Sequence, residues 1–260
     1  MTPSVKCGFG LEPSPDRAGS GAAGLTPIVA LVSSIPYSIR RSDRARRARI
    51  QVSAEGVEVV VPRRLPIGEV EPFVEEKRAW IERTLRRMRE AEEEFAPARL
   101  ADTEQVPYLG ERLTLDVRVE LDRVRAHVAR RGGALEVSVS APGAQPLREA
   151  LERWYRRRAR VEVGSRLDAA VARAGRSYSG LQIRGQRSRW ASCSSNGSMS
   201  FNWRLLLAPS DILDYVVEHE VAHLDVHDHS ERFWALLASR SEGWEVHEAW
   251  LRRHGHSLRL

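Results

Sequence analysis

The sequence predicts an α+β fold, and two observations carry this prediction. Within residues 35–145, apolar residues alternate with polar ones over short runs, which is the pattern of half-buried strands. Within residues 146–260, apolar residues recur at three- and four-residue steps, which is the pattern of amphipathic helices. We therefore expect a strand-rich N-terminal region over 35–145 and a second, mainly helical domain over 146–260.

Residues 1–34 are expected to form a disordered N-terminal tail. The segment "MTPSVKCGFGLEPSPDRAGSGAAG" is rich in Gly, Pro, Ser and Ala. It offers too little apolar surface to offset the entropy that ordering would cost. The tail is therefore predicted to take no part in the core.

The strand-rich region is predicted to contain three strand pairs and one long helix. The segment "ARIQVSAEGVEVVVP" alternates across a turn at Glu55-Gly56 and indicates a hairpin. Apolar residues at helical spacing then predict a helix over about 69–95. Two further strand pairs follow in "LGERLTLDVRVEL" and "AHVARRGGALEVSVSAP", and the second of these turns at Gly132-Gly133.

The second domain is predicted to contain a hairpin between helices. A long helix is expected to begin at Pro146 and to continue to about 173. Asn196-Gly197 is a preferred turn dipeptide and separates the strands "RWASC" and "SMSFNW". Helices are then expected over about 211–225, from a cap at Ser230, and over "WEVHEAWLRRHG".

Composition limits the classes of protein that this chain can represent. Its 260 residues carry a net charge of +6, 42% hydrophobic residues and two cysteines. No apolar run approaches the roughly 20 residues of a membrane span, and no signal peptide is recognisable. We therefore expect a cytoplasmic protein with reduced thiols and no membrane partner. The sequence gives no indication of the oligomeric state.

A histidine-rich stretch carries the strongest functional signal. Residues 215–234 read YVVEHEVAHLDVHDHSERFW and hold four of the eight histidines. His219 and His223 are four residues apart, so on a helix their imidazoles project from one face and can bind a single ion. With Glu220 they form H-E-x-x-H, in which zinc polarises a water and the glutamate takes its proton.

A catalytic zinc needs a third protein ligand, and two histidines compete for this role. The helical pattern stops near Asp225 and resumes near Ser230, so the intervening residues must reverse the chain. His229 follows this reversal and can turn toward the ion, which favours it as the ligand. His227 would leave only three residues after His223 for the same reversal and is retained as the alternative.

These motifs resemble those of a known family. The segments "RSRWASCSSNGSMSFNWRLLLAP", "DYVVEHEVAHL" and "HSERFW" are similar to those of the YgjP-like metallopeptidases, relatives of the SprT and Wss1-type zincins. The match is strong over about 187–234. It implies a zincin-like catalytic half, in which the HExxH helix lies beside a β-hairpin. It also implies zinc bound by His219, His223 and His229, Glu220 as the catalytic base, and a peptide or protein substrate.

The resemblance makes two further points about the site. It implies that the "FNWR" strand is the edge strand beside the metal, where a peptide substrate can add as a further strand. Asp228 stands where the family usually has Asn, and it could bond a ligand imidazole or change its basicity. The residue that steadies the oxyanion stays unassigned among Arg184, Tyr178 and Asn202.

Three alternatives were weighed against a zinc peptidase. The ten-residue spacing from His219 to His229 also fits metzincins, but Val226 occupies their glycine position and no methionine follows Met199. Cys193 could be a nucleophile, yet no base lies beside it in sequence. The basic composition allows a nucleic-acid-binding protein with a structural or vestigial metal site, or a protease that acts on DNA-bound proteins.

Overall fold

The computed structural model describes residues 29–32, 35–53, 56–95, 100, 104–122, 124–186 and 189–260. Most of the tail predicted over 1–34 lies outside these residues, as does Glu55 of the first predicted turn. Contacts divide the described residues into two compact units, one before and one after the boundary between Ala96 and Pro97. The contacts thus divide the chain at a different place from 145/146, where the composition changes.

The first unit contains one four-stranded sheet and a helical segment. The sheet has the order β1-β2-β4-β3, in which β2 and β4 run parallel and β3 and β4 form the expected antiparallel hairpin. Branched side chains alternate inward from these strands, and Val59 and Val61 are fully buried. Its elements are β1 (Val29–Val32), β2 (Ile35–Ser42), β3 (Arg49–Ser53), β4 (Gly56–Pro62), η1 (Ile67–Glu69), α1 (Val70–Glu76) and α2 (Arg78–Glu94).

The helix expected over 69–95 is present but interrupted. It consists of η1, α1 and α2, and the break between α1 and α2 falls at Lys77. The Lys77 backbone N–H donates to the Val74 carbonyl, a tightened last turn that ends α1. Val70, Val74 and Ile81 are buried against the sheet, so the apolar periodicity persists across the break.

The second unit contains a four-stranded sheet on its N-terminal side. Its order is β5-β6-β8-β7, with β5–β6 and β7–β8 antiparallel and β6–β8 parallel. The turn at Gly132-Gly133 joins β7 to β8 as expected, and Gly132 adopts a positive φ of 58°. Its strands are β5 (Gln105–Tyr108), β6 (Glu111–Val119), β7 (His127–Arg131) and β8 (Ala134–Val139).

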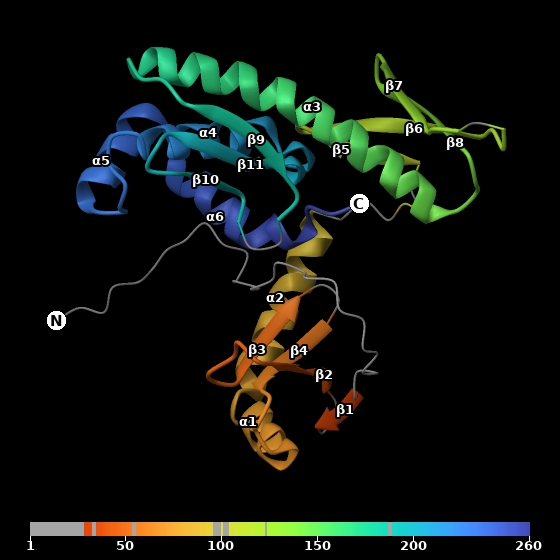
Figure 1. Cartoon of the computed structure of the whole chain (residues 1–260), viewed down its shortest axis with the longest axis vertical. Coiled ribbons are helices and arrows are strands. Elements are labelled where there is room, and N and C mark those ends of the chain that lie inside the picture. The colour runs from red at the N-terminus through yellow and green to blue at the C-terminus, as the bar shows by residue number, and fades with distance from the viewer. Residues whose placement is uncertain are drawn as a thin grey trace. The chain divides into compact units, whose positions relative to one another are not determined.

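One long helix, α3 (Ala144–Arg173), connects this sheet to the rest of the unit, as Figure 1 shows. It confirms the helix predicted over 146–173. Its buried stripe includes Trp154, Tyr155 and Val163. Tyr155 donates a hydrogen bond to the Pro107 carbonyl, and its ring packs against Trp154 and Trp203. These contacts pack β5 and Trp203 against the buried stripe of this helix.

A three-stranded sheet and three helices complete the second unit. The sheet order is β10-β11-β9, with β10 antiparallel and β9 parallel to the central β11. The β10–β11 hairpin turns at Asn196-Gly197, as predicted, and Gly197 has a φ of 75°. The elements are β9 (Gly180–Arg184), β10 (Ala191–Cys193), β11 (Ser198–Asn202), η2 (Trp203–Leu207), α4 (Ser210–Ala222), α5 (Glu231–Arg240), α6 (Trp244–His254) and η3 (Gly255–Ser257).

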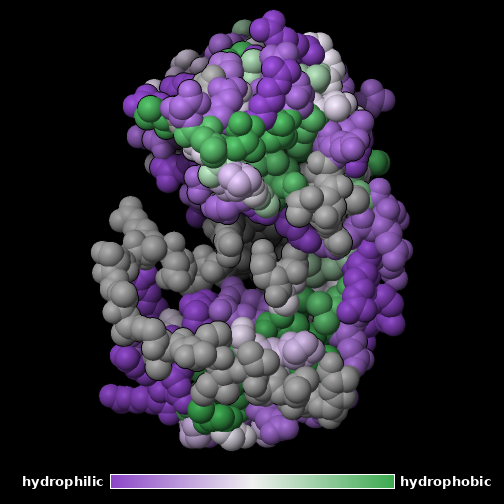
Figure 2. Space-filling view, turned by 90° about the vertical axis from the view of Figure 1, so that its right-hand side faces the viewer, coloured by the Kyte–Doolittle hydropathy of each residue, from purple (hydrophilic) through white to green (hydrophobic). Residues whose placement is uncertain are grey.

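The described residues therefore form a mixed α+β protein with six α-helices and three small sheets, which confirms the predicted class. No helix in the described part of the chain has the length and apolar character that crossing a membrane requires. Apolar side chains nevertheless reach the surface on β6, where Val117 and Val119 are more than two-fifths exposed. Figure 2 shows apolar side chains gathered in the upper part of the face that it presents, among hydrophilic ones.

Candidate metal centre

Helix α4 supplies two of the three predicted ligands. His219 lies in its last turn and His223 is its C-terminal cap, with the His223 N–H donating to the His219 carbonyl at 3.3 Å. The four-residue spacing brings the two imidazole rings to a centroid separation of 4.9 Å. Nearly every residue of the helix is buried, which fixes the axis that carries these rings.

His229 reaches the same point from the segment between α4 and α5. Its Nε2 lies 3.1 Å from Nε2 of His219, and its ring centroid lies 4.7 Å from that of His223. One nitrogen from each ring falls within 4.8 Å of the other two, so the three histidines form a single group. His227 is exposed and lies outside this group. The chain reversal thus places His229 where the sequence argument expects it.

Asp225 fixes the turn that returns the chain to His229. Its carboxylate accepts a hydrogen bond from Arg176 at 2.7 Å and another from Arg240 at 2.8 Å. Arg176 follows α3 and Arg240 ends α5, so three segments meet at one carboxylate that is only 14% exposed. Burial alone would raise the pKa of the Asp225 carboxyl. The two guanidinium groups outweigh this effect and lower the pKa below its usual value. The turn is therefore held in place by its ionic contacts with Arg176 and Arg240.

The carbonyl of Val226 sets the orientation of the His223 ring. It lies 3.0 Å from His223 Nδ1, and because a carbonyl can only accept, Nδ1 carries the proton. The other nitrogen, Nε2, therefore keeps its lone pair for the centre of the group. Metal-binding histidines commonly have such a backbone partner, which fixes the tautomer and the ring plane.

Phe233 forms the apolar floor beneath the three rings. Its ring centroid lies 4.8 Å from that of His219, 4.5 Å from that of His223 and 4.7 Å from that of His229. Phe233 is fully buried. The ring centroid of its neighbour Trp234 lies 5.5 Å from that of His229. The histidines thus meet above an aromatic surface that excludes water from one side.

This environment keeps the histidines neutral. Burial, together with the nearby His223 and His229, lowers the pKa of His219 to about 2. Burial likewise lowers the pKa values of His223 and His229 below the ordinary value. Neutral imidazoles with converging lone pairs are the form that binds a metal cation.

Glu220 is buried beside this group, and 3% of it is exposed. Burial raises the pKa of its carboxyl to about 8, while a hydrogen bond from the Cys193 backbone and the charge of Arg189 act in the opposite direction. Among the described residues, no donor pairs with Glu220 Oε2. The carboxyl is therefore held at one side by the β10 backbone and carries one oxygen without a protein partner.

The donor set fits a divalent zinc ion. Two nitrogens bound tetrahedrally at about 2.0–2.1 Å from zinc lie about 3.3 Å apart. The observed Nε2 separation of 3.1 Å between His219 and His229 is close to this value. Among the residues that the structure describes, three imidazoles and no fourth protein ligand form the group, which is the donor set of a catalytic zinc site rather than of a closed structural one.

The other residues considered for the site lie in different surroundings. The Asp228 carboxylate accepts from the Ser230 backbone N–H at 3.2 Å, while its charge favours the protonated form of His229. The three candidates for oxyanion stabilisation have partners of their own. Tyr178 donates to Asp168, Arg184 donates to Gln182, and Asn202 donates to the Gln186 carbonyl and accepts from the Arg204 N–H.

The expectation that the "FNWR" strand forms the sheet edge is wrong. That segment lies in β11 and η2, and β11 is the central strand because β9 pairs with it in parallel. The edge strand on the side of α4 is β10, which contains Cys193. Burial raises the pKa of the Cys193 thiol to about 11 and the Glu220 charge adds to this effect, which disfavours the thiolate form that a nucleophile needs.

Three contributors to the site escaped prediction from the sequence. Phe233 lies four residues after His229, on the first turn of the following helix, and the motif itself does not single it out. The Val226 carbonyl and the Asp225 network carry no sequence signal, because backbone orientation and distant arginines determine them. Only the contacts in the folded structure reveal these roles.

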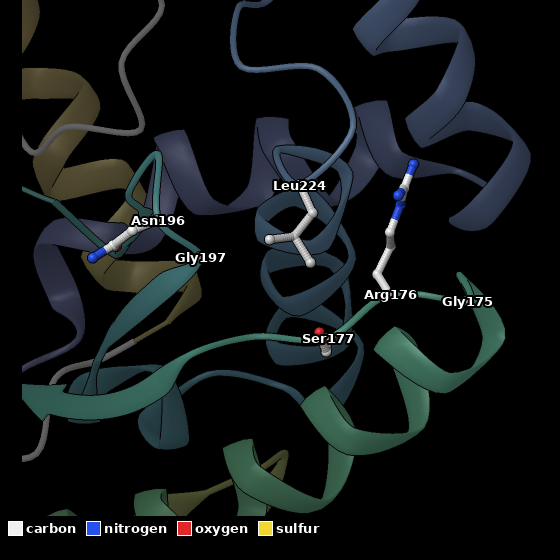
Figure 3. A pocket seen from close by; sticks show the side chains of 6 residues that line it. All are labelled: Gly175, Arg176, Ser177, Asn196, Gly197 and Leu224. Carbon is white, nitrogen blue, oxygen red and sulfur yellow. The ribbon is translucent and has the colours of Figure 1, made fainter.

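A separate pocket of about 560 Å³ opens near the C-terminal end of α4. Figure 3 shows Leu224 projecting between the Asn196-Gly197 turn and the loop of Gly175, Arg176 and Ser177. The three histidines and Glu220 do not line it. The pocket therefore adjoins the Asp225 network rather than the histidine group.

Comparison with models of known families agrees with the resemblance seen in the sequence. The model of the YgjP-like metallopeptidase domain matches residues 46–254. No curated protein matches the chain. Among solved structures, the chain is similar to the crystal structure of the metallopeptidase zymogen of Pyrococcus abyssi abylysin at 24% identity. That alignment covers 35% of this chain and 90% of the other, with a TM-score of 0.31. Because the family model spans most of the sequence, the chain belongs to the family of YgjP-like metallopeptidases.

Proposed function

We propose that this protein is a zinc-dependent peptidase of the zincin type, with His219, His223 and His229 as metal ligands and Glu220 as general base. Its family implies a divalent metal and a protein or peptide substrate. The observation that carries the finer assignment is the convergence of three neutral imidazoles beside one buried carboxyl. We assign the catalytic half to residues 146–260, which contain all four of these residues.

The residues around the ligands prepare the site for this chemistry. When bound, zinc would polarise both a water molecule and the carbonyl of the scissile peptide bond. Glu220 lies next to His219 in sequence, and its Oε2 is available to take a proton. A pKa near 8 is close to the pH of the reaction, which suits a group that must first accept a proton and then donate it. A divalent cation at the histidines would favour the ionised, proton-accepting form.

The edge strand β10 is the strand on which an extended substrate would add, and its Ala191 is 6% exposed in the free protein. Trp190 O and Ser194 N bond to β11, so by the alternation of a β ladder the backbone groups of Ala191 and Cys193 face away from it. The Cys193 N–H is used by Glu220. The N–H and C=O of Ala191 can therefore pair with a peptide that adds as a further strand. Such a peptide would lie beside the general base.

Replacement of the general base tests the proposal directly. Glu220→Gln keeps the size of the side chain and removes its ability to take a proton. We expect the variant to retain about one zinc per chain and to hydrolyse an unfolded protein about 10²- to 10⁴-fold more slowly. A chelator should abolish hydrolysis by the unmodified protein. An undiminished rate in the zinc-loaded variant would remove Glu220 from the mechanism.

A further inference from the structure

The middle of α3 and the adjoining strand β9 present a set of exposed arginines. Arg153, Arg157 and Arg160 are spaced four and three residues apart, so they form one stripe along the exposed side of α3. Arg184 is exposed at the end of β9, and Figure 1 shows β9 beside α3. We call these four side chains the arginine surface.

Contacts confirm that helix and strand form one surface here. Arg160 Nη1 lies 3.4 Å from the Leu181 carbonyl of β9. At Gly185, the residue after β9, any Cβ would lie 2.5 Å from Arg156 Nη2, so the α3 side chain rests directly on the strand backbone. Arg204 also donates to the Gly185 carbonyl at 3.3 Å. The guanidinium groups of Arg156 and Arg204 therefore lie beside Gly185, at the end of β9.

The positive charge of this surface is not neutralised by the helix itself. Glu152 pairs with Arg156, and Glu162 pairs with both Arg158 and Arg166. The acids in the middle of α3 are thus bound to other arginines. Within the described part of the chain, no acidic side chain forms an ion pair with Arg153, Arg157, Arg160 or Arg184. A surface of this kind attracts a polyanion.

We propose that the arginine surface binds the phosphodiester backbone of a nucleic acid. Planar guanidinium groups match phosphate oxygens in a bidentate geometry. The stripe from Arg153 to Arg160 is about 10 Å long at 1.5 Å per residue. Adjacent phosphates of one duplex strand advance by about 3.4 Å along the helix axis, so the stripe covers the axial rise of about three phosphates. A single nucleotide would occupy only part of this length, which favours a polymer.

This surface is independent of the proposed peptidase chemistry. None of its four arginines contacts the histidine group or Glu220 in the described structure. Phosphate contacts carry no sequence information, so we expect binding to be independent of base sequence and strongly weakened by salt.

The test measures anisotropy of a labelled DNA duplex of about 20 base pairs as salt is raised from about 50 to 200 mM. Arg153→Gln, Arg157→Gln and Arg160→Gln are combined in one variant. The matched control combines Arg83→Gln, Arg86→Gln and Arg87→Gln on α2, where exposed glutamates lie among the arginines. We expect the α3 variant to lose at least about tenfold in affinity at low salt, and its log–log salt slope to fall by about 2 to 3.

Other outcomes would overturn the proposal. These are negligible binding at low salt, equal losses in the α3 and α2 variants, or displacement of DNA by a nucleoside triphosphate as effectively as by unlabelled DNA at equal phosphate concentration. A variant that combines Arg153→Lys, Arg157→Lys and Arg160→Lys keeps the charge and should retain most of the binding, which separates loss of contact from loss of folding. Peptide hydrolysis should be the same in all these variants, so failure here leaves the peptidase assignment untouched.

Discussion

Nε2 of His219 and Nε2 of His229 face each other across 3.1 Å, although ten residues and the end of a helix separate them in the chain. Two neutral imidazoles this close are favourable only if a proton or a cation lies between them or at their common focus. His223 completes that focus through the ring fixed by the Val226 carbonyl. The turn between α4 and α5 therefore directs the three histidine rings toward one common point.

Glu220 makes the stability of the metal-free protein depend on pH. Its pKa is raised to about 8 in the folded state, whereas the unfolded chain titrates at its ordinary value of 4.5. Between these two pKa values, the folded state still holds a proton on Glu220 that the unfolded chain has released. The contribution of Glu220 to the free energy of unfolding therefore falls as pH rises through this range. The loss is up to about 1.4 kcal/mol per pH unit.

Glu220→Gln should lack this dependence, because the amide does not titrate. We expect urea unfolding with a chelator to show the variant gaining stability relative to the unmodified protein between about pH 6 and pH 8. A stability difference that stays constant over this range would show that the buried carboxyl does not titrate there.

Asp225→Asn should weaken metal binding without a large loss of fold. The amide keeps the shape of the side chain but loses the two charge-assisted bonds to Arg176 and Arg240 that hold the turn before His229. Supporting residues of this kind commonly change metal affinity by about 10- to 100-fold. The measurement is zinc affinity by competition with a chromophoric chelator.

Asp214→Asn is the matched control for Asp225. Asp214 lies on α4 and, like Asp225, pairs with an arginine, Arg166 at 2.7 Å. It precedes His223 by nine residues, however, and its side chain is 55% exposed. We expect its zinc affinity to stay within about twofold of the unmodified value. Equal effects of the two substitutions would assign the Asp225 network to general stability alone.

Phe233→Leu should separate the aromatic floor from ordinary core packing. The substitution removes the ring that touches all three imidazoles, whereas Phe201→Leu removes an equally buried ring from β11. Both should lower the free energy of unfolding by about 1–2 kcal/mol. Only Phe233→Leu should also change the absorption spectrum of the cobalt-substituted protein, since only this ring orients the ligands. Identical spectra would contradict its positioning role.

Ala191→Pro tests substrate pairing on β10. Proline removes an N–H that faces away from β11, so the sheet should tolerate it on this edge strand. Loss of one backbone hydrogen bond to a peptide should raise KM by about 2- to 10-fold, with zinc content unchanged. The N–H of Ser192 faces β11, so Ser192→Pro should instead destabilise the fold. A normal KM in Ala191→Pro would remove β10 from substrate binding.

Local patterns predicted much of this fold. The periodicity of α3, the Asn196-Gly197 hairpin and the HExxH spacing on α4 depend on neighbours within a few residues, and each is found in the structure. The parallel pairings of β2 with β4, β6 with β8 and β9 with β11 depend on distant segments, so the sequence did not indicate them. The wrong edge-strand assignment follows from this, because β9 covers the side of β11 that a local reading leaves open.

The histidine group shows the same division between local and distant information. The spacing of His219 and His223 follows from helix geometry alone, and the reversal before Ser230 favours His229 over His227. The support of that reversal could not be foreseen, because Arg176 and Arg240 lie 49 and 15 residues from Asp225. A ligand set can thus be read from a motif, whereas the network that holds it requires the fold.

Metal content of three purified proteins tests the central claim most directly: the unmodified chain, His229→Ala and His227→Ala. The account predicts about one zinc per chain in the unmodified protein and in His227→Ala, and a large loss of zinc in His229→Ala. Retention of zinc by His229→Ala together with its loss from His227→Ala would contradict the ligand set, and absence of zinc from all three would contradict the metal centre itself.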